Sequence, residues 1–118
     1  MKIVTVLLYL IFLFLFSVCS DDCEGENPTV ILANNGTAKA DIQIKTSGGN
    51  TENINNIAVG TISEKRSFAP GLIEFTIAIQ GEDENIIYKL EVFFCTDYYL
   101  VINPDNSVSA SSIKRDLI

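Results

Sequence analysis

The chain contains no histidine and no tryptophan, and its only methionine is the first of its 118 residues. Without histidine it lacks the commonest general base, the commonest neutral metal ligand and the side chain that titrates near neutral pH. A serine or cysteine nucleophile would need lysine as its base. These absences argue against an enzyme, and we expect neither catalytic residues nor a metal or other cofactor.

Basic residues are also scarce, with eight lysines and arginines against 15 aspartates and glutamates and a net charge of −7. Without Lys2, which belongs to an N-terminal export segment, seven basic residues face the same 15 acidic ones, a net charge of −8. An acidic domain repels nucleic-acid phosphates and anionic lipid headgroups. We therefore expect no nucleic-acid partner, and we expect any membrane attachment to be covalent.

Residues 1–20 have the order of a secretory signal peptide. A short positive start at Lys2 precedes the apolar run 3–16, small or medium residues follow, and Asp21 and Asp22 end the run. The apolar run is shorter than the roughly 20 residues that cross a bilayer. Cleavage after Ser20 would release a soluble secreted or periplasmic domain, and cleavage before Cys19 would leave this cysteine for lipidation.

The stretch Phe16-Ser17-Val18-Cys19 resembles a lipobox, and the stretch Ser20-Asp21-Asp22-Cys23-Glu24 resembles the Ser-Asp-Asp-x-Glu export tag of flavobacterial-type surface lipoproteins. The resemblance covers about ten residues. It implies that Cys19 carries a lipid anchor and that the protein reaches the outer membrane or the cell surface.

Three cysteines are an odd number for an exported protein. Cys19 is either acylated or removed with the signal, so Cys23 and Cys95 remain as a pair. An oxidising compartment favours a disulfide between them, although two unpaired thiols remain the alternative. Chain entropy gives such a cross-link a stabilisation of about 4 kcal/mol.

After an acidic tether at 21–28, apolar and polar residues alternate repeatedly between turn residues, which is typical of β-strands. The prediction is one all-β domain over 29–112, a small antiparallel β-sandwich or meander of about seven to eight short strands, followed by a tail at 113–118. Its strand rhythm resembles immunoglobulin-like or transthyretin-like sandwiches, a fold-level likeness that implies no function. Alternation places these side chains in the core: Ala40, Ile42, Ile44, Ile73, Phe75, Ile77, Ile79, Leu90, Val92, Leu100 and Ile102.

Four local features give more specific expectations. Asn35-Gly36 predicts a hairpin turn, because both residue types tolerate a positive φ. Residues 51–60 contain a short edge strand, and residues 61–68 form a single polar strand at a sheet edge. Residues 86–95 are apolar on both faces near their ends, which predicts a central strand.

The candidate binding surface is weakly marked. Tyr88 and Tyr99 can stack against a ligand, and Glu82, Asp83 and Glu84 form an acidic loop. The loops 81–85 and 105–107 are rich in oxygen ligands that suit calcium, but neither has EF-hand spacing. We expect an exported, lipid-anchored interaction or accessory module that meets a protein or a glycan. The alternatives are a soluble secreted domain that binds calcium or glycan, and a minimal hydrolase.

Overall fold

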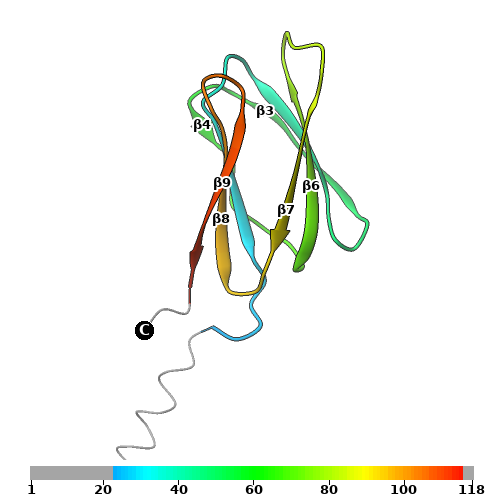
Figure 1. The fold of residues 1–118 in the computed structure, drawn as a ribbon, viewed down its shortest axis with the longest axis vertical. Helices are drawn as coiled ribbons and strands as arrows, with labels where there is room; N and C mark the ends of the chain where they lie inside the picture. The colour runs from blue at the N-terminus through cyan, green and yellow to red at the C-terminus, as the bar shows by residue number, and fades with distance from the viewer. Residues whose placement is uncertain (1–22, 116–118) are drawn as a thin grey trace, which may run out of the picture.

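The computed structural model describes residues 23–115, which form two β-sheets packed face to face (Figure 1). The predicted all-β sandwich is therefore confirmed. Sheet A consists of β1 (Thr29–Asn34), β4 (Thr61–Ile62), β5 (Arg66–Ser67), β8 (Thr96–Ile102) and β9 (Val108–Lys114). Sheet B consists of β2 (Ala40–Lys45), β3 (Thr51–Ile57), β6 (Gly71–Ile79) and β7 (Ile86–Val92).

Strand pairing is antiparallel except between β1 and β8, which are parallel with Val30 opposite Tyr98. In sheet A, β8 lies between β1 and β9, and β4 and β5 pair with the other edge of β1. In sheet B the order is β3-β2-β6-β7. β3 is an edge strand as predicted.

One hydrophobic core fills the space between the sheets and takes side chains from both. Alternation predicted it well, because each strand turns one row of side chains inward. Ten of the eleven predicted core residues are buried, and Leu90 is half-buried and packs against them. The remaining core residues are Val30, Leu32, Ile54, Ile57, Phe68 and Tyr98.

The predicted hairpin at Asn35-Gly36 is wrong, because β1 and β2 belong to different sheets. The two residues lie in a crossing between the sheets. Gly36 does not have a positive φ. A Cβ at Gly36 would lie 2.5 Å from Asn106 Oδ1 and 3.0 Å from Ile102 Cγ2. Glycine is therefore needed there for close packing and not for turn geometry.

The structure also corrects two strand predictions. β7 is an edge strand and ends at Val92, so residues 86–95 do not form a central strand. The single strand predicted over 61–68 is split into β4 and β5. Between them the Ser63 hydroxyl accepts a hydrogen bond from the Leu32 N–H at 3.0 Å, so a side chain takes the place of a backbone partner.

The chain reverses direction at two ends of the sandwich (Figure 1). One end holds Cys23, the β7–β8 loop (93–95) and Arg115, and is called the disulfide end below. The other holds the β1–β2 crossing (35–39) and the β6–β7 and β8–β9 loops, and is called the opposite end. β9 reaches Lys114, two residues beyond the predicted end of the domain. The predicted signal peptide and Cys19 lie outside the described residues.

Candidate functional site

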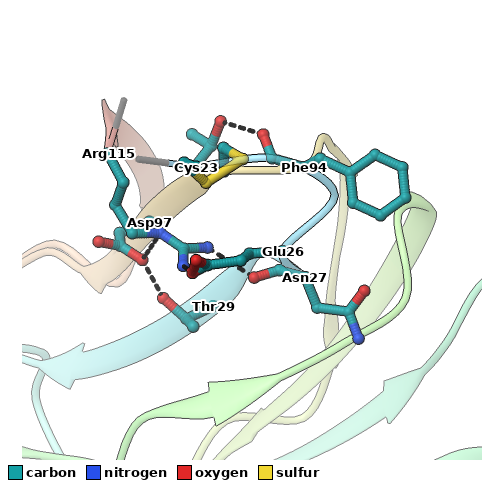
Figure 2. A network of polar contacts seen from close by, with 9 residues as sticks. Cys23, Glu26, Asn27, Thr29, Phe94, Asp97 and Arg115 are labelled. Atoms are coloured by element: carbon teal, nitrogen blue, oxygen red, sulfur yellow. Dashed lines mark hydrogen bonds and ion pairs between the residues drawn. A yellow bond between two sulfur atoms is a disulfide. The ribbon is translucent and has the colours of Figure 1, made fainter. Parts of the chain in front are cut away.

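The disulfide end contains the cross-link that the cysteine count predicts. Cys23 and Cys95 are joined, with an S–S distance of 2.06 Å and a Cα–Cα distance of 5.8 Å (Figure 2). The bond connects the segment before β1 to the loop between β7 and β8, across 72 positions of sequence. Disulfides are typical of proteins that fold in an oxidising compartment outside the cytoplasm.

Backbone hydrogen bonds extend this connection to the end of β9. The Cys95 N–H donates to the Glu26 carbonyl at 2.9 Å, and the Arg115 N–H donates to the Cys95 carbonyl at 2.8 Å. Three segments far apart in sequence therefore meet at the disulfide. The first and the last described residues lie at the same end of the domain.

The Arg115 guanidinium adds polar contacts to the same junction (Figure 2). Nη1 binds Glu26 Oε1 at 2.9 Å, and Nη2 donates to the Asn27 carbonyl at 2.6 Å. Nε lies 3.0 Å from Asp97 Oδ1, an ion pair without the alignment of a hydrogen bond. The same Asp97 oxygen accepts a 2.6 Å hydrogen bond from the Thr29 hydroxyl. From Cys23 onward, the predicted acidic tether is thus bound to the sandwich.

Two phenylalanines project from the β7–β8 loop at this end. Phe93 is 60% exposed and Phe94 is 50% exposed. The Phe94 ring points away from the polar network in Figure 2. A cleft of about 600 Å³ lies beside the loop, lined by Phe93, Phe94, Tyr98, Ser112, Lys114 and Glu91. Sequence reasoning missed this feature because it assigned the two phenylalanines to a central strand, in which adjacent side chains would point to opposite faces.

The opposite end is held by side-chain amides. Asn34 is fully buried, and its Nδ2 donates to the carbonyls of Ala38 at 2.9 Å and Ile57 at 2.8 Å. Its Oδ1 accepts from the Gly36 N–H at 2.9 Å. Asn106 makes two hydrogen bonds to Thr37, one from the Thr37 N–H at 3.0 Å and one to the Thr37 hydroxyl at 2.9 Å. These contacts connect the β1–β2 crossing to the β8–β9 loop.

The residues predicted as an acidic binding loop lie at the opposite end. Glu82, Asp83 and Glu84 are exposed, and Glu82 Oε1 is 3.4 Å from Asn106 Nδ2. In the β8–β9 loop, the Asp105 carboxylate accepts hydrogen bonds from the Ser107 hydroxyl at 2.6 Å and N–H at 3.0 Å. These two bonds lower the pKa of Asp105, and the bond from the Ser107 hydroxyl has the larger effect. Residues 23–115 contain no group of three or more His, Cys, Asp or Glu side chains placed to hold a metal ion.

The predicted tyrosines do not form one surface. Tyr88 is half-buried on β7 and packs against the core, whereas Tyr99 lies on the outer face of sheet A. Tyr98 points inward and is 6% exposed. The adjacent Tyr98 and Tyr99 thus point to opposite faces of sheet A, as neighbouring residues of a strand do.

The outer faces of the two sheets differ in charge. In sheet B, Lys45, Glu74 and Lys89 lie opposite one another on neighbouring strands, a row of alternating charge. The outer face of sheet A instead carries apolar side chains. They lie opposite one another on β1 and on its two neighbours, β4 and β8. These residues are Ile31, Ala33, Ile62, Tyr99 and Val101. We call this group the apolar face of sheet A.

No protein-family model and no curated protein sequence matches the chain. Among solved structures, the C-terminal domain of AlgF from P. aeruginosa is similar in fold, with a TM-score of 0.49 and 13% sequence identity. The similarity covers 76% of this chain and 99% of that one. It does not bear on function. Within residues 23–115, no helix has the length and hydropathy of a membrane span.

Proposed function

We propose that the chain is an exported β-sandwich that is anchored to the cell surface by a lipid on Cys19 and acts as a non-enzymatic interaction or accessory module. The observation that supports this most is the fixation of Cys23 to the body of the domain. Cys19 precedes Cys23 by four residues, and four extended residues span at most about 14 Å. A lipid on Cys19 would therefore hold one defined end of the sandwich close to the membrane.

The apolar face of sheet A is the surface proposed to meet a partner protein. The centres of protein interfaces are depleted of charged residues and enriched in tyrosine, and this face has both features. A glycan is the second partner class, since Tyr99 could stack against a sugar ring. The charged outer face of sheet B has neither feature and serves as an internal reference.

Replacement of Cys19 by Ala tests the anchor. Wild-type protein from its native cells should enter the detergent phase after partitioning with Triton X-114, and Cys19→Ala should stay in the aqueous phase. Ser20→Ala is the matched control and should behave like the wild type. Entry of Cys19→Ala into the detergent phase would show that acylation at this position is wrong.

A charge placed on the apolar face tests the partner surface. Tyr99→Glu should lose the proteins that the wild type retains after cross-linking on intact cells, because a buried carboxylate would be left without a partner. Gln43→Glu introduces the same charge on the outer face of sheet B and should retain them. Equal retention by both variants would contradict the assignment of the surface.

A further inference from the structure

Exposed apolar side chains are concentrated at the disulfide end. Residues 23–115 contain seven large hydrophobic side chains with exposures from 49% to 68%, and only two of them, Phe93 and Phe94, are aromatic. Leu72 lies at the same end, since its neighbour Gly71 pairs with Val92, the residue before Phe93. Ile113 also lies there, opposite Asp97. Four of the seven therefore lie at the disulfide end.

The loop that carries the two phenylalanines is firmly held. The Phe93 N–H donates to the Tyr98 hydroxyl at 2.9 Å, and the Thr96 hydroxyl donates to the Phe94 carbonyl at 3.0 Å. The next residue, Cys95, is fixed by its disulfide and by the Glu26 carbonyl. These contacts therefore fix the loop conformation in which the two rings are exposed. No charged residue lies between Glu91 and Asp97 in the sequence, so the loop is apolar along its length.

The position of this loop relative to Cys19 points to its ligand. Phe94 is next to Cys95, whose Cα is 5.8 Å from that of Cys23, and Cys23 is four residues from Cys19. We propose that Phe93 and Phe94 enter the interfacial layer of the bilayer that holds the Cys19 lipid. The domain then stands on its disulfide end, with the loop Glu82–Glu84 away from the membrane. This proposal rests on the lipid anchor of the proposed function.

A lipid on Cys19 attaches the domain to the membrane at one point, and a second contact beside it limits how far the domain can tilt. Phenylalanine, tryptophan and leucine are typical of segments that lie at the boundary between headgroups and acyl chains. Without Lys2 the net charge is −8, from seven basic and 15 acidic residues, so the lipidated chain cannot use a polybasic segment as this second contact. Exposed phenylalanines beside the anchor supply it without charge.

The absence of tryptophan makes this contact measurable. Phe94→Trp introduces a single tryptophan into the full lipidated protein, which is then reconstituted into phosphatidylcholine vesicles containing a brominated phosphatidylcholine. Bromine quenches tryptophan that lies among the acyl chains. Val59→Trp is the matched control, because Val59 is 49% exposed and lies between β3 and β4 at the opposite end. Phe93→Trp is a second probe if Phe94→Trp does not fold.

A shift of Phe94→Trp emission to shorter wavelength together with loss of intensity on brominated vesicles, and neither change for Val59→Trp, is the expected result. Unquenched Phe94→Trp on vesicles with which the protein floats would overturn the inference and leave the anchor intact. A blue shift without quenching would show that protein and not lipid covers the ring, which also overturns it. Equal quenching of both probes would refute the upright orientation.

Flotation separates this proposal from the anchor on which it rests. If protein from its native cells does not float with vesicles, the lipid on Cys19 is wrong. A chain that begins at Cys19, produced without the export segment, can then be coupled at this thiol to a maleimide lipid, since Cys23 and Cys95 are paired with each other. Emission from the coupled protein supports or overturns the phenylalanine contact by the same criteria.

Discussion

At the disulfide end, contacts join residues 68 to 89 positions apart, namely Thr29 to Asp97, Cys23 to Cys95 and Glu26 to Arg115. At the opposite end, the described residues contain no disulfide and hydrogen bonds hold the loops: the Asn34 amide reaches partners two, four and 23 positions away, and Asn106 reaches Thr37, 69 positions away. The disulfide restricts the unfolded chain as well as the folded domain, because it persists on unfolding. Hydrogen bonds act in the folded state alone. This difference suits a domain that is held at one end and presents loops at the other.

The largest effect should come from removing the long-range cross-link. Replacement of both Cys23 and Cys95 by Ser should lower the free energy of unfolding by about 4 kcal/mol, because the unfolded chain regains the entropy of a 72-residue loop. Urea denaturation measures this change. Cys19→Ser is the control and should leave the midpoint where it is. A loss below about 1 kcal/mol would mean that Arg115 and its partners hold the disulfide end without the covalent bond.

The amide at the opposite end should come second. Asn34→Ala removes three hydrogen bonds and leaves the Gly36 N–H and the carbonyls of Ala38 and Ile57 without this partner. The expected loss is about 2–3 kcal/mol, since unsatisfied buried polar groups keep their full desolvation cost. Denaturation of Asn35→Ala, an exposed neighbour, provides the reference and should change little. Equal stability of the two variants would show that water replaces the Asn34 amide.

The ion pairs of Arg115 should matter less than either. Its side chain is 26% exposed and that of Asp97 is 19% exposed, so solvent screens the pair in part. Arg115→Gln should cost about 1 kcal/mol at low salt and less in high salt. Lys114→Gln removes a neighbouring positive charge that is exposed, and its midpoint should not move. A salt-independent loss for Arg115→Gln would assign the effect to packing of its carbon chain instead.

Sequence reasoning predicted the inward faces because the period of a strand is local. Ile42 lies between Asp41 and Gln43 in an alternating run, and no other part of the chain is needed to place it. It failed for the pairing of β1, whose neighbour β8 lies 68 positions away in sequence, and for the β1–β2 crossing. Asn-Gly is compatible with a hairpin, and only the close approach of Asn106 and Ile102 reveals that glycine is required for packing.

The same distinction between local patterns and contacts between distant segments applies to the candidate site. The cysteine count favours pairing Cys23 with Cys95, and the structure has this bond. The Arg115 contacts could not be predicted, because Glu26 and Asn27 become neighbours of Arg115 only when β9 lies beside β8. The sequence predicts a central strand over residues 86–95 from its apolar ends, and this strand includes Phe93 and Phe94. Apolar character does not distinguish a buried strand from an apolar loop held by a disulfide and a tyrosine hydroxyl.

The smallest effect concerns the Asp105 turn at the opposite end. Hydrogen bonds from the Ser107 side chain and then from its backbone lower the pKa of Asp105 below 3.8. A lowered pKa in the folded state contributes stability that is present above the unfolded pKa and is lost as pH falls through the folded value. Because the carboxylate is fully exposed, unfolding curves should hardly register this loss. A titration followed by NMR at the Asp105 carboxyl carbon measures it directly. Ser107→Ala removes the larger cause and should raise the pKa toward 3.8, whereas Ser109→Ala, one step further along β9, should not. A pKa that stays unchanged in Ser107→Ala would mean that the backbone N–H alone holds the turn. The contrast between an end fixed by a disulfide and an end fixed by side-chain hydrogen bonds would then rest on Asn34 and Asn106.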